Sequence, residues 1–295
     1  MNAKLTKRIL QARLDGRYIQ TPRLFLMPLD VSDAADVFKW TGDPDVTQFM
    51  NYSTYTSVSD VADWIKADGY KSFGIFLKDG DQLIGCGDAR KNRSGETELG
   101  YNLAKAYWGK GYCTEAAKAI IAYNVAQGNT DFVCKHAADN VRSGRVICKC
   151  GFTYVKDGSY TSFDGLRTFA DREYGLHINR FEMDVDGEWF DKIVIGSKTV
   201  ELRLNDEKRR KIKTGDCIIL NNLDLDSDVR KCVVRVTQLH CFSDFNGLYA
   251  SLDMSKCGYG ADEKANPDDM LRYYSEQRQA EYGVVGIQFE LLAVM

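Results

Sequence analysis

The segment that most constrains the fold lies in the first half of the chain, where a strand-like run gives way to a glycine-rich turn and then a helix. It reads Tyr107-Trp108-Gly109-Lys110-Gly111-Tyr112-Cys113-Thr114-Glu115-Ala116. Two glycines let the backbone adopt unusual dihedrals and approach a ligand closely. The helix that we expect from about Thr114 leaves the N–H groups of its first turn unpaired. The sequence therefore predicts an anion site suited to a diphosphate.

A Gly-x-Gly pair before a helix also occurs in ordinary turns, so its surroundings decide the interpretation. The flanking segments alternate between strand and helix patterns, with an Asp-Gly hairpin signal at 78–81. We expect strands over 23–29, 73–77, 82–87, 96–103, 132–137 and 152–155. We expect helices after Ser32 or Asp33, after Ser57, from Thr114 to Gly128 and from Val141 to Cys150.

Taken in order, these pieces resemble the GNAT acyltransferase family, in its branch of ribosomal-protein N-terminal acetyltransferases (RimJ/RimL-like). The resemblance is carried by Thr21-Pro22-Arg23-Leu24, Gly85, Glu98-Leu99-Gly100-Tyr101, the Trp108–Ala116 segment, Asn140-x-x-Ser143 and Lys149-Cys150-Gly151-Phe152. Ala106 departs from the broad family, which often has Gln or Arg there. The resemblance implies an α+β protein whose residues 1–178 form a GNAT mixed α/β domain with a central, mostly antiparallel sheet.

The resemblance also implies acetyl-coenzyme A (acetyl-CoA) as cofactor, held in a cleft between two central strands that splay apart. A backbone N–H near Tyr101–Leu103 would polarise the acetyl carbonyl. Asn140 has a second interpretation, as a plain helix N-cap, and both roles are compatible. The cofactor contacts implied by the resemblance are Tyr101, Asn102, Leu103, Trp108, Gly109, Lys110, Gly111, Tyr112, Cys113, Thr114 and Asn140.

Acetyl transfer requires a neutral amine, so a base helps, more for lysine than for an α-amine. Glu98 is the first candidate base and Glu96 the second, since alternate strand residues share a face. An exposed strand glutamate without a role is the competing interpretation. By family position Ser143 would give a proton to the departing thiolate, with Tyr101 and Tyr112 as other donors. Ser143 can equally be a small first-turn helix residue.

A covalent acyl-cysteine at Cys113, Cys134 or Cys150 is disfavoured, because buried cysteines are usually inert. The nine cysteines and three histidines show no zinc-type spacing, so no metal is expected. A reduced, cytoplasmic location is the simplest interpretation. The first twenty residues lack the apolar run of a signal peptide, and no segment approaches the roughly 18 apolar residues of a membrane span.

The second half follows a junction near 179–188 and alternates strands with a few helices. Expected strands cover 198–204, 217–220, 231–240 and 284–292, and a helix from Asn266-Pro267 is expected to run to Gly283. This pattern suggests a small mixed barrel. The segments 196–203, 212–216 and 282–287 resemble the ASCH family. That resemblance implies a PUA-like β-barrel over residues 185–295 that binds RNA or a nucleotide.

Some members of the ASCH family hydrolyse acetylated cytidine, and Lys198 matches their lysine. Their catalytic threonine corresponds to Glu201 here, so ligand binding is favoured over hydrolysis. The predicted pocket consists of Lys198, Thr199, Glu201 and Arg203. Residues 179–295 hold 16 basic and 21 acidic residues, a balance of 16 − 21 = −5, so RNA would need a local basic patch. The one dense basic cluster that could contact phosphates consists of Arg203, Lys208, Arg209, Arg210, Lys211 and Lys213. The competing interpretation is a charged loop exposed to solvent.

Three functions remain open from the sequence. The first is an N-acetyltransferase acting on a primary amine, either a protein N-terminus or a small molecule, with an accessory RNA- or nucleotide-binding domain. The second is an RNA-binding or RNA-modification protein whose main activity lies in the barrel, with the first domain sensing acetyl-CoA. The third is an acetyltransferase of polyamines or antibiotics whose barrel stabilises a dimer. We expect a monomer or homodimer with no membrane partner.

Overall fold

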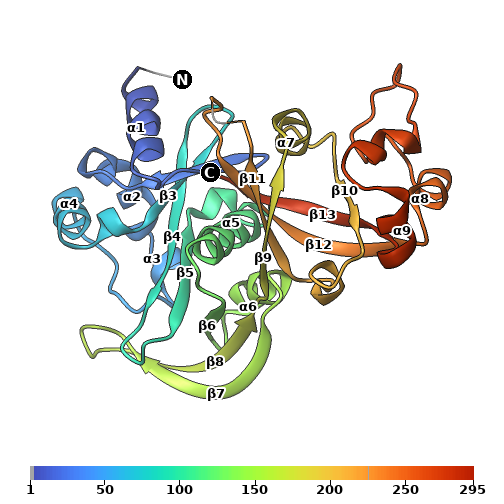
Figure 1. The fold of residues 1–295 in the computed structure, drawn as a ribbon. Helices are drawn as coiled ribbons and strands as arrows, with labels where there is room; N and C mark the ends of the chain where they lie inside the picture. The colour runs from blue at the N-terminus through green and yellow to red at the C-terminus, as the bar shows by residue number, and fades with distance from the viewer. Residues whose placement is uncertain (1–2, 225) are drawn as a thin grey trace. The chain divides into compact units, whose positions relative to one another are not determined.

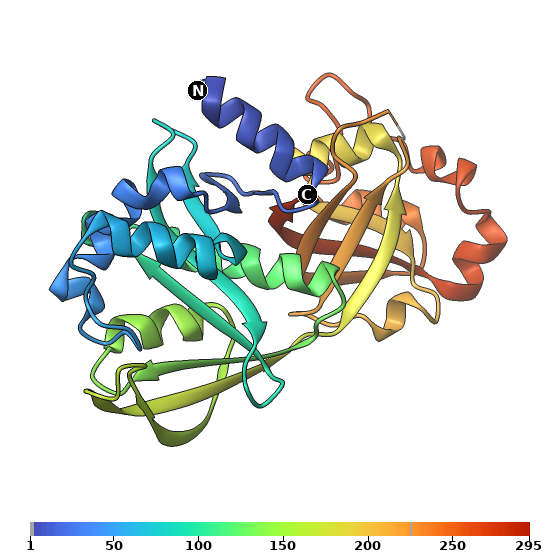
Figure 2. The same ribbon diagram turned by 90° about the vertical axis from the view of Figure 1, so that its left-hand side faces the viewer.

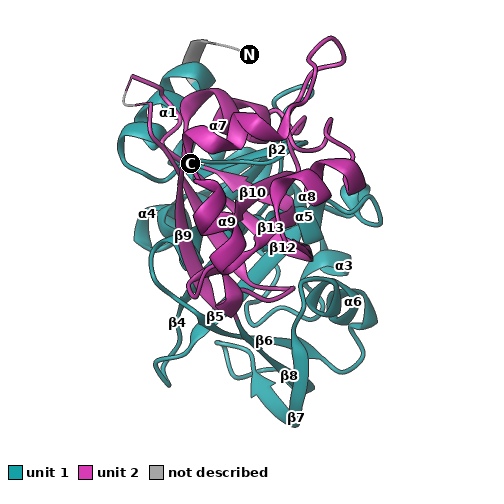
Figure 3. Cartoon of the chain, turned by 45° about the vertical axis from the view of Figure 1, so that its right-hand side comes forward, with its two compact units in different colours: residues 1–177, 295 teal, residues 178–294 magenta. Residues whose placement is uncertain are grey.

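The computed structural model describes residues 3–224 and 226–295. The chain divides into two compact units, residues 1–177 with Met295 and residues 178–294, which Figure 3 distinguishes by colour. Each unit has its own set of strands and its own hydrophobic core. We describe each unit by itself.

The first unit is built on a sheet with the strand order β7-β8-β6-β5-β4-β3-β2-β1. Neighbouring strands pair antiparallel except β5 and β6, which run parallel. The strands are β1 (Ile19–Gln20), β2 (Leu24–Pro28), β3 (Phe73–Leu77), β4 (Leu83–Lys91), β5 (Thr97–Leu103), β6 (Asp131–Ala137), β7 (Thr153–Thr161) and β8 (Thr168–His177). The expected, mostly antiparallel mixed α/β unit is therefore present.

Helices cover this sheet, and their starts coincide with capping residues. Ser57 caps α4 through a side chain that accepts from the Asp60 N–H, and Asn140 caps α6 in the same way. The α-helices are α1 (Ala3–Leu14), α2 (Ala34–Thr41), α3 (Pro44–Thr47), α4 (Val58–Ala67), α5 (Tyr112–Ala126) and α6 (Val141–Lys149). Three 3-10 turns accompany them: η1 (Val31–Asp33), η2 (Gly69–Lys71) and η3 (Lys105–Tyr107).

Helix α5 is largely buried and lies against β4 and β5 (Figure 1). Ile120 is fully buried within it, and burial of such a side chain contributes about 2 kcal/mol. A separate core joins α2 and α4 through Val37, Trp40, Val61 and Ile65. Helices α2 and α5 contact β4, and α5 also contacts β5, so packed helices support the strands that carry the predicted site.

Strands β7 and β8 form a long curved hairpin at one edge of the first unit's sheet (Figure 2). A register shift between Tyr154 and Lys156 marks a bulge in β7. The sequence predicted only 152–155 of this hairpin as strand. Most of β7 is exposed, so no apolar alternation revealed it. Helix α1 was likewise not predicted, although Leu5, Ile9 and Ala12 pack against β2 and β3.

The second unit has a sheet of five described strands, with β13 paired on one side to β10 and on the other to β12, followed by β11 and β9. Only β9 and β11 pair in parallel. The strands are β9 (Arg180–Val185), β10 (Val200–Leu204), β11 (Cys217–Asn222), β12 (Lys231–Phe242) and β13 (Val284–Val294). The described pairs do not link β9 to β10, so the sheet is mixed and strand-rich but not shown to be a closed barrel.

Short helices complete the second unit. They are α7 (Gly187–Val194), η4 (Arg209–Lys211), α8 (Phe245–Ser251), η5 (Pro267–Arg272) and α9 (Glu276–Tyr282). The single helix expected from Asn266 to Gly283 is wrong, because η5 stops at Arg272 and Ser275 caps a new helix, α9. The Ser275 hydroxyl oxygen accepts from the Arg278 N–H, which favours the start of a new helix. In the part of the chain that is described, no helix combines the length and apolar character needed to span a membrane.

Candidate active site

The glycine-rich turn that dominates the sequence forms the start of α5. Gly109 and Gly111 have φ of 77° and 82°, in the left-handed region that favours glycine. Gly111 is the N-cap, and the first helical hydrogen bond runs from Glu115 N to Gly111 O at 3.1 Å. The N–H groups of Tyr112–Thr114 therefore have no partner within the helix. Together with the helix dipole, they form an arrangement that suits a phosphate group.

Three residues that the sequence did not assign to the site fix this helix start. The Glu115 carboxylate accepts from Thr21 Oγ1 at 2.7 Å, Arg23 N at 2.9 Å and Arg23 Nε at 2.6 Å. Arg23 Nη1 also donates to Lys110 O at 2.9 Å. These charge-assisted bonds hold the turn in place. The Thr21-Pro22-Arg23-Leu24 motif and an acidic residue in the first turn were visible in the sequence, but their contact was not.

Cationic side chains also gather at this turn. The Arg142 guanidinium lies over the Trp108 ring at 5.0 Å, and Lys110 Nζ lies 5.5 Å from the centre of the Tyr107 ring. The indole of Trp108 donates to Leu103 O at 2.7 Å, which connects the turn to the end of β5. These positive charges favour an anionic ligand beside the free amides.

Strands β5 and β6 pair at only two positions and then diverge. Glu98 with Val133 is the last pair. Beyond it β5 stays paired with β4 as far as Leu103, while β6 continues to Ala137 paired with β8. Leu99 O still accepts from Cys134 Sγ of β6 at 3.2 Å, and beyond Leu99 the edge of β5 faces an opening among the described strands. Its backbone groups on that edge are available to a ligand, as the splayed-strand expectation requires.

Two predicted residues meet across this opening. Tyr101 Oη lies 3.0 Å from Ser143 Oγ and donates to Ser143 O at 3.2 Å. Asn140 Oδ1 accepts from Ser143 N at 3.2 Å, so the N-cap interpretation of Asn140 describes its contact. Burial raises the pKa of Tyr101 well above its ordinary value, so its phenol remains a proton donor. The hydroxyls of Tyr101 and Ser143 form one hydrogen-bonded pair beside the β5 edge.

Glu98 lies on the opposite face of β5 from this hydroxyl pair, because strand side chains alternate. Its carboxylate accepts from Asn92 Nδ2 at 3.2 Å, and the same amide donates to Glu96. Asn102 shares the Glu98 face and donates to Tyr52 Oη at 3.1 Å. The two predicted catalytic residues therefore face different sides of the opening.

The cysteines near the site are poorly suited to carry an acyl group. Burial raises the pKa of the thiols of Cys113 and Cys134 far above the ordinary value. Cys150 is also buried. A thiol held in its protonated form is a weak nucleophile, which agrees with direct transfer.

The second unit places a charged cluster inside its fold. Lys198 and Glu201 are 4% and 5% exposed, and Glu201 Oε2 lies 3.4 Å from Lys198 Nζ. Arg203 also pairs with the Glu201 carboxylate and donates to Asp184 O at 2.8 Å. Glu201 Oε2 nevertheless accepts no hydrogen bond from a described group. A buried charged oxygen without a hydrogen bond is unfavourable, so this atom is suited to a polar ligand.

The contact between Lys198 and Glu201 corrects one strand expectation. Regular alternation along the expected strand 198–204 would put Lys198 on the face opposite Glu201, but the strand begins only at Val200. The amides of Thr199 and Val200 both bond Lys256 O, so the chain before β10 is not a regular strand. Lys198 Nζ is then free to donate to Cys257 O at 2.8 Å.

Some cations of the basic cluster at 203–213 are engaged within the second unit, and others are exposed. Arg209 pairs with Asp206 at 2.7 Å, and Arg210 donates to Tyr282 O at 3.0 Å. Lys208, Lys211 and Lys213 are exposed. Two adjacent tyrosines follow η5. Tyr274 packs against Phe245, whereas Tyr273 is 40% exposed and donates to Asp186.

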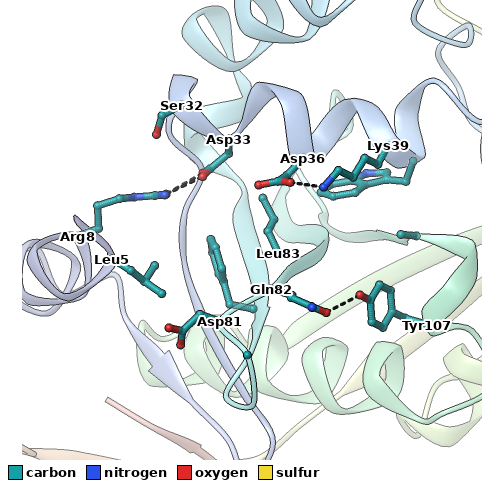
Figure 4. Close-up of a pocket in the computed structure, with 14 residues that line it drawn as sticks. Leu5, Arg8, Ser32, Asp33, Asp36, Lys39, Asp81, Gln82, Leu83 and Tyr107 are labelled. Carbon is teal, nitrogen blue, oxygen red and sulfur yellow. Dashed lines mark hydrogen bonds and ion pairs between the residues drawn. The ribbon is translucent and has the colours of Figure 1, made fainter. Parts of the chain in front are cut away.

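A separate cavity of about 460 Å³ lies beside α1 and α2 in the first unit. Figure 4 shows Arg8 pointing to Asp33 and Lys39 pointing to Asp36 along its wall. Its lining contains none of the predicted site residues. The cavity is therefore not the place where the predicted chemistry converges.

Comparison with known proteins agrees with the division of the chain into two compact units. The model of an acetyltransferase (GNAT) domain matches residues 23–153, and the model of an ASCH domain matches residues 183–293. The uncharacterized N-acetyltransferase p20 of Bacillus licheniformis is 31% identical over 144 residues, which cover 45% of this chain and 81% of p20. The uncharacterized N-acetyltransferase YnaD of Bacillus subtilis (strain 168) is 30% identical over 139 residues, with 45% and 81% covered.

A solved acetyltransferase of the GNAT family from Bacillus anthracis has a similar fold. The TM-score is 0.50 at 21% identity, and the match covers 54% of this chain and 98% of that one. This similarity concerns the fold alone.

Proposed function

Because the chain belongs to the GNAT N-acetyltransferase family, it is an acyltransferase that uses acetyl-CoA, and we propose that it acetylates a primary amine by direct transfer. The observation that carries the proposal is the divergence of β5 from β6 beside a helix start with free amides. The first supplies a slot with unpaired backbone, and the second supplies a site for phosphate. The two lie in one unit and are joined by the bond from Trp108 to Leu103.

The residues of this unit fit the cofactor. Backbone N–H groups from Trp108 to Thr114, including those of Gly109, Lys110, Gly111, Tyr112 and Cys113, hold the diphosphate in this proposal. The edge formed by Tyr101, Asn102 and Leu103 supplies an N–H for the acetyl carbonyl oxygen. Asn140 contacts the pantetheine arm in addition to capping α6. Acetyl-CoA itself supplies an acetyl group activated as a thioester.

Glu98 and Ser143 divide the proton transfers. Glu98 takes a proton from the acceptor amine, directly or through water. Ser143 gives a proton to the sulfur that leaves, and Tyr101 Oη can replace that proton at 3.0 Å. Because the two groups lie on opposite faces of β5, an amine and a thioester can approach from different sides. Positioning then supplies much of the acceleration.

We propose residues 1–178 as the GNAT domain, of RimJ/RimL-like type, and residues 185–295 as the ASCH domain with a PUA-like β-barrel. The acceptor is a protein N-terminus or a small-molecule amine, and the protein acts in the cytoplasm as a monomer or homodimer. The compact units and the ranges of the two matching domains support this division.

The ASCH domain is proposed as an accessory module that binds RNA or a nucleotide. Its pocket consists of Lys198, Thr199, Glu201 and Arg203, and the unbonded Glu201 Oε2 supports a polar ligand there. The free hydrogen-bonding capacity of Glu201 Oε2 also supports an alternative function, an RNA-binding or RNA-modification protein. In this alternative the main activity lies in the ASCH domain, and the first unit senses acetyl-CoA. Filter binding of RNA at several salt concentrations tests the module, since phosphate contacts weaken with salt. RNA affinity that is absent at low salt contradicts an RNA role.

The enzymatic proposal is tested by thiol release from acetyl-CoA in the presence of a panel of peptides, polyamines and aminoglycosides. Glu98→Gln is expected to lower kcat about 100-fold, as general bases typically contribute 10²–10⁴. Glu96→Gln tests the second candidate base in the same assay, because Glu96 accepts from the same Asn92 amide. Equal activity of Glu98→Gln and the wild type excludes Glu98 as base. Calorimetry that detects no binding of acetyl-CoA contradicts the cofactor site itself.

A further inference from the structure

The face of the sheet that carries Glu98 continues across the opening onto β6, β8 and β7. Glu98 pairs with Val133, and four residues further along β6 Ala137 pairs with Asp171. Asp171 pairs in turn with Gly158. Paired residues and alternate residues of a strand share a face. Asp171 therefore lies on the Glu98 face, at the far end of β6 where the strands have separated.

Asp171 is a buried carboxylate without a partner. It is 4% exposed, and no hydrogen bond or ion pair joins its side chain to another group in residues 3–224 or 226–295. Lys135 Nζ, whose charge acts on Asp171, is itself paired with Glu173 at 3.0 Å. Burial raises the pKa of Asp171, although the Lys135 charge opposes the shift. An unpaired buried carboxylate is unfavourable, so it persists where a ligand needs it.

The surroundings keep this carboxylate reachable. A Cβ at position 158 would lie 2.7 Å from Asp171 Oδ1, so glycine in β7 leaves the space beside the carboxylate open. The Asp171 oxygens are also not sealed off. Within the described part of the chain, the fully enclosed polar side-chain atoms without a hydrogen bond are in Trp40, Thr97, Glu201 and Arg209, and Asp171 is not among them.

Aromatic rings adjoin Asp171 on the same face. Tyr160 and Phe169 follow it at alternate positions of β7 and β8, with ring centroids 5.0 Å apart. The ring centroids of Phe49 and Phe169 are 6.2 Å apart, and Tyr160 Oη donates to Phe49 O at 2.5 Å. Faces of aromatic rings attract cations and pack well against alkyl carbons. The combination of a buried anion with three rings matches an aliphatic ammonium group.

The segment 47–53 spans from the hairpin to β5. Arg167 donates to the carbonyl oxygens of Thr47, Met50 and Tyr52, which fixes the segment to the turn of the hairpin. At the other side Tyr52 Oη accepts from Asn102 on β5. The segment therefore connects both sides of the opening on the face that carries Glu98 and Asp171.

We propose that Asp171 binds an ammonium group of the acceptor, with Phe49, Tyr160 and Phe169 against its alkyl part. This rests on the proposed acetyltransferase function and names its acceptor class as a cationic aliphatic amine. Asp171 acts as a specificity residue that pairs with the ammonium form as the amine binds, and the amine then gives its proton to Glu98 before the neutral nitrogen attacks the thioester.

The test compares Asp171→Asn with Asp157→Asn, a matched control whose carboxylate is 75% exposed on the neighbouring strand. The acceptors are benzylamine and its isomer 4-methylaniline, of which only benzylamine is protonated at neutral pH. Thiol release gives KM for each amine and for acetyl-CoA. Asp171→Asn is expected to raise KM for benzylamine at least about 30-fold, because one partner of a buried charge pair is lost. KM for acetyl-CoA and for 4-methylaniline stays within about threefold, and Asp157→Asn matches the wild type.

Two further measurements complement this test, the first without the Asn variant and the second without turnover. Gly158→Ala keeps the carboxylate but fills the space beside it, and is also expected to raise KM for benzylamine. In thermal unfolding, benzylamine raises the Tm of the wild type but not that of Asp171→Asn.

An Asp171→Asn variant with the wild-type KM for benzylamine overturns the proposal, as does an equal loss for both isomers. A wild type that releases no thiol with any amine contradicts the acetyltransferase function instead. In that case an equal Tm rise in the wild type and Asp171→Asn overturns the Asp171 assignment independently.

Discussion

Replacement of Gly111 by alanine tests the anion site at the start of α5. Gly111 has φ of 82°, and an added Cβ would lie 3.3 Å from Arg23 Nη2, a distance that a shift of a few tenths of an ångström relieves. The steric contact is therefore small, and backbone strain dominates. An alanine in the left-handed region costs about 1–2 kcal/mol. The variant relieves this strain by turning the peptide, and so turns an N–H group away from the ligand.

Binding must then restore the strained conformation. A penalty of 1–2 kcal/mol corresponds to a Kd for acetyl-CoA that rises about 5- to 30-fold. Calorimetric titration of acetyl-CoA and CoA into folded protein measures this directly. Both ligands should lose affinity equally, because they share the diphosphate.

Gly128→Ala is the matched control. Gly128 also has a positive φ, 95°, with open space around its Cβ, but it follows the opposite end of α5. It should lower stability by a similar amount while leaving Kd unchanged. A Gly111→Ala variant with the wild-type Kd, or equal losses of affinity in both variants, refutes the assignment of the diphosphate to this turn.

Three other outcomes test the remaining contacts. Ser143→Ala is expected to lower kcat about 100-fold with the Kd for acetyl-CoA unchanged, and stopped-flow thiol detection that shows full kcat excludes Ser143 as donor. Glu115→Ala removes three hydrogen bonds to charged or polar donors and should destabilise the first unit by about 2 kcal/mol in urea unfolding. A change under about 0.5 kcal/mol would mean that Glu115 does not stabilise the start of α5. Lys198→Met should destabilise the second unit by about 3 kcal/mol because Glu201 loses a buried cation, and adding Glu201→Gln should recover part of the loss in the same assay.

Local chemistry explains which elements the sequence could predict. Ser57 and Asn140 are good N-cap residues followed by apolar residues at helical spacing, and both cap helices where expected. The strand β3 coincides with the expected 73–77 because an Asp-Gly turn follows an apolar run. Helix α1 was missed, since its apolar residues are sparse and its stability comes from packing on β2 and β3.

The site was predictable where its parts are contiguous in sequence and not where three strands must come together. The turn at Gly109 and Gly111 is such a contiguous part, and its dihedrals follow from glycine. Asp171 lies beside Gly158 and beyond β6 only because two antiparallel pairings set its register. An isolated aspartate in an exposed-looking hairpin carries no sign of burial. Long-range register of this kind is not encoded in local periodicity.

The pH dependence of stability gives a separate test of the Asp171 carboxylate. Its pKa is raised in the folded state, mainly by burial, with Glu173 and Asp157 adding to the effect and Lys135 and His136 opposing it. Between the unfolded pKa, near 3.9, and the raised folded value, the folded state binds more protons than the unfolded state. Stability therefore falls as pH rises through this window, and the carboxylate weakens the fold at neutral pH.

Removal of this charge should reverse the effect. Asp171→Asn is expected to be more stable than the wild type at pH 7 by about 1 kcal/mol, the order of the penalty for an unsatisfied buried group, with the difference vanishing at about pH 3.5. Urea unfolding at several pH values measures this difference, with Asp157→Asn as the exposed control. A variant less stable than the wild type at pH 7 would mean that the carboxylate supports the fold. A fold that is weakened by its own aspartate at neutral pH is instead what a residue kept for a cationic ligand produces, because the charge is compensated only when the amine is bound.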